Sequence, residues 1–120
     1  HRSYWYKGIY NSKDGKEHYY KSLWELDFMK RLDASCNVKN WDYEILAIKY
    51  RLNNSNKTYI PDFVIETNDN KKYLIEVKPK ALIETKINIS KKNAAIEWCS
   101  KNDHEFSCVS KENFDNISFL

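Results

Sequence analysis

The sequence has few of the residues that interrupt regular structure, with only two glycines and two prolines among its 120 residues. We therefore expect no long linker, and a chain of this length fits one domain with one hydrophobic core. No apolar run approaches the roughly 20 residues needed to cross a bilayer, so we expect no membrane association. Hydrophobic residues at 42% and aromatic residues at 15% supply enough apolar surface for such a core.

Cysteine is also scarce, and Cys36, Cys99 and Cys108 show no CxxC spacing. This odd number disfavours both a zinc site and a disulfide framework, and it favours a reducing, cytoplasmic setting. Cys99 and Cys108 fall in apolar patterns and are predicted to be small core residues. The charges are nearly balanced, and the net charge of +3 gives only a mild preference for polyanionic partners.

Two signals define the N-terminal part of the chain. Residues 4–20 place aromatic-rich flanks around Asp14-Gly15, which predicts a β-hairpin. Its interleaved lysines and tyrosines fit either a nucleic-acid surface or an ordinary hairpin with one packed face. Residues 22–33 predict a helix, in which Ser22 and Glu25 have the spacing of a capping box.

The rest of the chain predicts strands and one more helix. Alternating apolar residues predict strands at 43–52, 59–66 and 72–78, joined as an antiparallel meander. A helix at 90–102 and a strand at 104–110 follow, and this crossover favours a final strand parallel to an inner one. We therefore predict an α/β fold, with a mixed sheet flanked by helices and an N-terminal β-hairpin.

Charged residues interrupt two of the predicted strands. Strand alternation places Glu76 and Lys78 on one face, and the short meander brings Asp62 beside Glu76. Two carboxylates on rigid strands fit Mg²⁺, which prefers oxygen ligands and keeps open positions for water and phosphate. The structural alternative is a turn aspartate with an exposed charge pair, and the capping box alone explains Glu25.

These residues carry a family resemblance. Pro61-Asp62 followed by Glu76-Val77-Lys78 resembles the motif of the PD-(D/E)xK nuclease superfamily, which has the restriction-endonuclease-like fold. The resemblance covers roughly residues 18–114, and it is closest to TnsA-like and small phage-encoded endonucleases. One departure from the family pattern is Lys21, where relatives often carry an arginine. Lysine lacks the bidentate fork of arginine, which weakens a phosphate clamp carried over to this position.

The resemblance implies a DNA endonuclease that depends on Mg²⁺, which Mn²⁺ can replace, and leaves 5′-phosphate and 3′-hydroxyl ends. The implied catalytic residues are Glu25, Asp62, Glu76 and Lys78. The implied metal ligands are Asp62, Glu76, the backbone carbonyl of Val77 and, directly or through water, Glu25. Lys78 would orient or activate the attacking water. The candidate DNA contacts are Lys21, Lys80 and Lys86.

On this interpretation residues 1–120 form one nuclease domain, with the hairpin at 1–20 and the catalytic core at 21–114. The expected partners are DNA and either a second copy or a partner protein, in a bacterial or phage-infected cell, with a phage or mobile element as the source. Three alternatives stay open. The chain could be a structure-selective, junction-resolving nuclease, a DNA-binding or phage structural protein that lost catalysis, or a globular domain whose charges are coincidental.

Overall fold

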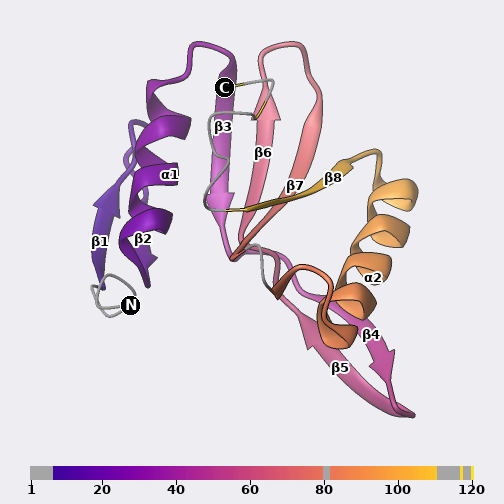
Figure 1. The fold of residues 1–120 in the computed structure, drawn as a ribbon. Coiled ribbons are helices and arrows are strands. Elements are labelled where there is room, and N and C mark those ends of the chain that lie inside the picture. The colour runs from indigo at the N-terminus through magenta and orange to yellow at the C-terminus, as the bar shows by residue number, and fades with distance from the viewer. Residues whose placement is uncertain (1–6, 80–81, 111–116, 118–119) are drawn as a thin grey trace.

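The computed structural model describes residues 7–79, 82–110, 117 and 120. In chain order its elements are β1 (Gly8–Asn11), β2 (Glu17–Tyr20), α1 (Leu23–Ala34), β3 (Val38–Tyr43), β4 (Ile48–Leu52), β5 (Ser55–Tyr59), β6 (Phe63–Thr67), β7 (Lys72–Lys78), α2 (Lys86–Asn102) and β8 (Glu105–Ser110). Figure 1 shows the N-terminal hairpin and α1 on one side of the central sheet, with α2 on the other. Neither of these helices is long and apolar enough to cross a membrane.

The central sheet has the strand order β3-β6-β7-β8. β3 and β6 pair antiparallel, as do β6 and β7, whereas β8 pairs parallel to β7 after the α2 crossover. The predicted mixed α/β architecture, its N-terminal hairpin and the parallel final strand are confirmed. The meander that carries the candidate site consists of β3, β6 and β7.

The first strand of that meander was predicted wrongly. Residues 38–43 form β3, which the sequence pattern did not predict, and residues 48–52 form β4 outside the central sheet. The chain bends at 44–47, opposite 60–62, so that β3 with β6 and β4 with β5 form two parts of one bent ribbon. Glu44 adopts a left-handed φ of 53°. Its N–H donates to the Asp62 carbonyl at 2.9 Å, which holds the bend.

The β4–β5 hairpin closes through a tight turn and its second strand begins at Ser55, whereas the sequence pattern predicted no strand between residues 52 and 59. Asn53 and Asn54 have φ of 52° and 64°, both in the left-handed region. Two consecutive left-handed residues form a type I′ turn, whose twist matches the two strands it joins. Asparagine tolerates this conformation better than most residues, so two adjacent asparagines explain why the turn forms here.

Two apolar clusters hold the helices against the sheet. α1 buries Phe28, Met29 and Leu32 completely, and the Phe28 ring lies 4.8 Å from that of Phe63 on β6. Burial of each such side chain contributes about 1.5–3 kcal/mol. On the opposite face, α2 packs through its buried residues Ala95 and Cys99. α2 begins earlier than the predicted residue 90, because the Thr85 side chain caps it at Lys86.

The N-terminal hairpin packs against the core through its aromatic side chains. The His18 ring stacks on Trp41 with centroids 4.3 Å apart, and Tyr10 donates its hydroxyl proton to Asp33 at 2.6 Å. Trp41 donates its indole N–H to the same carboxylate at 2.8 Å. One face of the hairpin is therefore packed, as the ordinary-hairpin interpretation predicts.

Candidate active site

The site begins where the backbone ladder between β6 and β7 ends. The last β6–β7 pair is Phe63 with Ile75. One step further, the Asp62 carboxylate takes the place of the missing backbone partner and accepts the Val77 N–H through Oδ2 at 2.8 Å. In a strand, the N–H and C=O of one residue point to the same side. The Val77 carbonyl therefore lies on the side of β7 that faces Asp62.

Glu76 lies one residue before Val77 on β7 and is 6% exposed. Tyr59, at the end of β5, donates its hydroxyl proton to Oε1 at 2.6 Å. The Lys78 ammonium lies 2.9 Å from Oε2, so Glu76 and Lys78 share one face of the strand as predicted. The two contacts fix the carboxylate from β5, which lies outside the central sheet, and from its own strand.

Asp62 is electrostatically unfavourable as an anion. Burial and then the charge of Glu76 raise the pKa of the Asp62 carboxyl well above its usual range, against the lowering effect of the Val77 N–H. Asp62 as a residue is half-buried, so it is not fully enclosed by the fold. A bound cation would relieve the repulsion between the two carboxylates. Two carboxylates and the Val77 carbonyl form an all-oxygen set that suits Mg²⁺.

Glu25 lies on the first turn of α1 and is 8% exposed. Its Oε1 accepts the Lys21 N–H at 2.7 Å and the Tyr43 hydroxyl at 3.0 Å. The bond runs to Lys21, one residue before the Ser22 N–H that a capping box would use. Burial raises the pKa of the Glu25 carboxyl, and its charge in turn helps to raise that of Asp62.

A metal site cannot be built here from side chains alone. Within residues 7–79 and 82–110, no three His, Cys, Asp or Glu side chains are grouped so that they could hold a metal ion. Glu25, Asp62 and Glu76 therefore do not make such a group by themselves. A cation would need the Val77 carbonyl and water in addition to Asp62 and Glu76.

The predicted DNA contacts have different surroundings. Lys21 is largely exposed but forms an ion pair with Glu44 at 2.8 Å. Lys86 is exposed at the first residue of α2, where the helix dipole favours an anion. Lys80 lies outside the described residues.

The sequence interpretation missed the two tyrosines that hold the glutamates. Tyr59 and Tyr43 end β5 and β3, and each donates to a buried carboxylate on a different element. Both lie in apolar runs, where a tyrosine is ordinarily a packing residue. No local spacing links them to Glu76 or Glu25, because the contacts depend on how the strands and α1 assemble.

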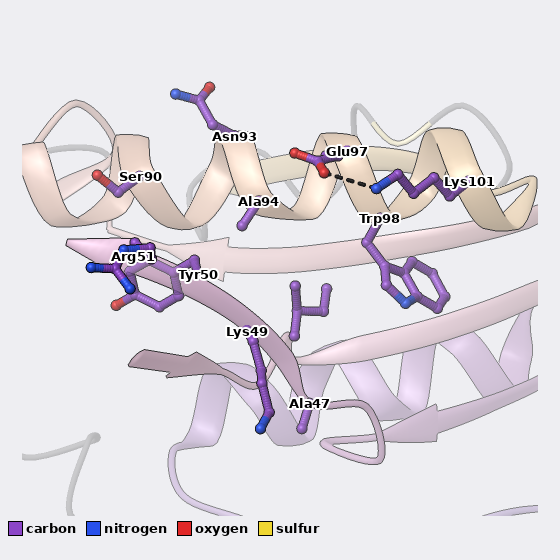
Figure 2. Close-up of a pocket in the computed structure, with 11 residues that line it drawn as sticks. Ala47, Lys49, Tyr50, Arg51, Ser90, Asn93, Ala94, Glu97, Trp98 and Lys101 are labelled. Atoms are coloured by element: carbon purple, nitrogen blue, oxygen red, sulfur yellow. Dashed lines mark hydrogen bonds and ion pairs between the residues drawn. The ribbon is translucent and has the colours of Figure 1, made fainter. Parts of the chain in front are cut away.

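A separate cavity of about 430 Å³ lies between β4 and α2. Figure 2 shows Trp98 reaching from α2 towards the strand, while Ala47 and Lys49 point away from the helix. The predicted site residues that the structure describes lie outside its lining. This cavity is therefore distinct from the Asp62–Glu76 site.

The chain matches the family model for the N-terminal domain of TnsA-like endonucleases over residues 35–111, which is more than half of its length. The matched segment includes Asp62, Glu76, Val77 and Lys78, whereas Glu25 precedes it. No curated protein matches the chain. Because the match spans all four strands of the central sheet and α2, the chain belongs to the family of TnsA-like endonuclease N-terminal domains.

Proposed function

We propose that this protein is a metal-dependent DNA endonuclease whose active site is centred on Asp62 and Glu76. The observation that supports it most directly is the Asp62 carboxylate, bonded to the Val77 N–H beside the buried Glu76, within a domain of an endonuclease family. A fold alone rarely stabilises a buried carboxylate beside a half-buried one, so the pair Glu76 and Asp62 fits a cation-binding role.

Asp62, Glu76 and the Val77 carbonyl would hold Mg²⁺, or Mn²⁺ in its place. The ion would supply a Lewis acid for a phosphate oxygen and a lower pKa for bound water. Tyr59 holds the Glu76 carboxylate in position through its hydrogen bond. Glu25, on α1, would contact the metal ion through a water molecule.

Lys78 would orient the attacking water and stabilise negative charge on the phosphate. Its side chain is 18% exposed and its ammonium lies 2.9 Å from Glu76, so the group is held next to the proposed reaction site. Water oxygen bonds to phosphorus, and the bond from phosphorus to the 3′ oxygen breaks. The leaving oxygen gains a proton, which gives 5′-phosphate and 3′-hydroxyl ends.

Cleavage of supercoiled plasmid with Mg²⁺, Mn²⁺ or EDTA tests this proposal. We expect metal-dependent cutting by the wild type that is lost in Asp62→Asn and in Lys78→Ala. Glu105→Gln removes an exposed carboxylate at the start of β8 and serves as the matched control, which should cut normally. Religation of the products by a DNA ligase would establish the end chemistry.

Folded wild-type protein that binds plasmid but cuts neither linear nor branched DNA would contradict the proposal and favour a DNA-binding protein. Cutting of branched DNA alone would identify a structure-selective nuclease with the same site. Because one site cleaves one strand at a time, concerted cutting of both strands would require a second copy or a partner protein. Sedimentation with and without DNA would reveal a homodimer.

A further inference from the structure

The β4–β5 hairpin carries positive charges and no negative charge. Between Ile48 and Tyr59 it carries Lys49, Arg51 and Lys57 and no carboxylate. Most of its other polar residues are asparagine, serine or threonine, which donate and accept hydrogen bonds without charge. Figure 1 shows this hairpin extending away from the central sheet beside α2.

The two faces of the hairpin differ in burial. The pair Ile48–Tyr59 lies on the inner face, where both side chains are buried against the α2 cluster. The adjacent pairs, Lys49 with Thr58 and Arg51 with Asn56, lie on the outer face, where all four residues are exposed. The Ile48–Tyr59 pair fixes the base of the hairpin against α2, and Lys49 and Arg51 are exposed on the outer face.

Arg51 is held in place by neutral groups. Its Nη1 donates to Asn56 Oδ1 at 2.9 Å, and its Nη2 donates to the Asn54 carbonyl at 3.0 Å. Within the part of the chain that the structure describes, Lys49, Arg51 and Lys57 form no ion pair, and the same holds for other exposed lysines such as Lys71 and Lys72. No carboxylate neutralises the Arg51 guanidinium, and two hydrogen bonds to neutral groups hold it in a fixed position. Its remaining N–H groups can therefore bind an anion.

The hairpin is joined directly to the candidate active site. Tyr59, its last residue, donates to Glu76, and Asp62 follows after the short bend. Each strand has five residues, which span about 17 Å at roughly 3.4 Å per residue. At roughly 3.4 Å per base pair, this length covers about five base pairs of duplex. The major groove of DNA is wide enough to admit a two-stranded ribbon.

We propose that the outer face of the β4–β5 hairpin docks in a groove of duplex DNA next to the scissile phosphate, with Lys49 and Arg51 as its principal contacts. The inference rests on the proposed endonuclease function and extends it to a specificity-determining surface. Arg51 would contact either a phosphate or the edge of a guanine, and base preference is confined to about five base pairs from the cut.

The test measures binding of a DNA duplex to the full chain by fluorescence anisotropy, in EDTA and across a series of salt concentrations. We expect Lys49→Ala/Arg51→Ala to weaken binding about ten-fold or more and to lower the salt slope by about 2. The control Lys71→Ala/Lys72→Ala removes the same charge from exposed positions at the far end of β7 and should change affinity far less. Thermal melts confirm that each variant is folded, and Lys49→Ala alone serves if the double variant unfolds.

The outcomes separate this inference from the function on which it rests. Equal affinity and salt slope in the hairpin and control variants, with normal plasmid cutting by the wild type, would overturn the docking surface alone. A wild type that neither binds nor cuts duplex would overturn both proposals. Arg51→Lys keeps the charge but loses the fork, so an altered distribution of cut sites with this variant would support a base contact by Arg51.

Discussion

Replacing Asp62 with asparagine is expected to stabilise the metal-free protein at pH 8 while it abolishes cutting. The asparagine side chain would keep the size of the original and an oxygen that accepts the Val77 N–H. It would remove the negative charge that burial and Glu76 make unfavourable. Active-site groups of this kind are commonly retained for function at the expense of stability.

The sign of the effect follows from the pKa. Because the pKa of the Asp62 carboxyl is raised in the folded state, the folded protein binds this proton more tightly than the unfolded chain does. The wild type therefore loses stability as pH rises from the ordinary carboxyl range to the raised pKa, and stays less stable above it. At pH values below the ordinary carboxyl range, Asp62 is protonated in both states, so the asparagine variant should gain little there.

The magnitude is the difference between two terms. Removal of the buried charge is expected to contribute about 2 kcal/mol, near the upper end of single stabilising substitutions. A neutral acceptor in place of a carboxylate weakens the hydrogen bond from Val77 by about 1 kcal/mol. The net gain of about 1 kcal/mol corresponds to a rise in Tm of about 4 °C for a domain of this size.

Thermal melts followed by circular dichroism provide the assay, in EDTA and then with Mg²⁺. In Mg²⁺ at about ten times its Kd, the wild type should gain about 1.4 kcal/mol and the asparagine variant should gain almost nothing. Glu105→Gln again controls for loss of an exposed carboxylate. A Tm below that of the wild type at pH 8 in EDTA would show that the Asp62 charge stabilises the fold, and the argument from charge repulsion would be wrong.

Two further predictions concern the contacts around Asp62 and Glu76. Tyr59→Phe leaves Glu76 Oε1 without its hydroxyl donor, so the free energy of unfolding should fall by about 1.5–3 kcal/mol. Urea titration measures this, with Tyr19→Phe, at an exposed tyrosine, as the control. Equal unfolding midpoints for the two variants would contradict the contact between Tyr59 and Glu76. Mg²⁺ affinity should rise with pH through and above the ordinary carboxyl range, because the ion competes with the proton that the raised pKa keeps on Asp62. Calorimetric titration at several pH values measures this, and a Kd independent of pH would argue against Asp62 as a ligand.

The elements with strong local signals were predictable from sequence. Ser22 caps α1 as its position indicated, and Asp14-Gly15 closes the first hairpin with Gly15 at φ 85°. Alternation along β7 placed Glu76 and Lys78 on one face, which their ion pair confirms. In each case the deciding interaction lies within a few residues, where periodicity and capping rules apply.

The features that the sequence concealed depend on contacts between distant segments. β3 has exposed residues at both Lys39 and Asn40, where its register with β6 shifts, so the alternation that predicts a strand is broken. The bend at 44–47 separates β3 from β4, yet residues 43–52 alternate well enough to resemble one strand. Tyr59 supports Glu76 only because the fold brings the end of β5 to that carboxylate, a contact that no local sequence pattern encodes.

The bend in the ribbon, more than the sheet itself, produces the candidate site. Pro61 has no N–H to donate, so the backbone ladder between β6 and β7 does not continue past Asp62. That interruption frees the Asp62 side chain to bond Val77, and it leaves the carbonyl of Val77 without a β6 residue opposite it. The same bend directs the β4–β5 hairpin away from the sheet while Tyr59 still contacts Glu76. A change in the direction of the hairpin would therefore move a support of Glu76, so DNA docking and the geometry of the carboxylates are expected to be coupled through this one tyrosine.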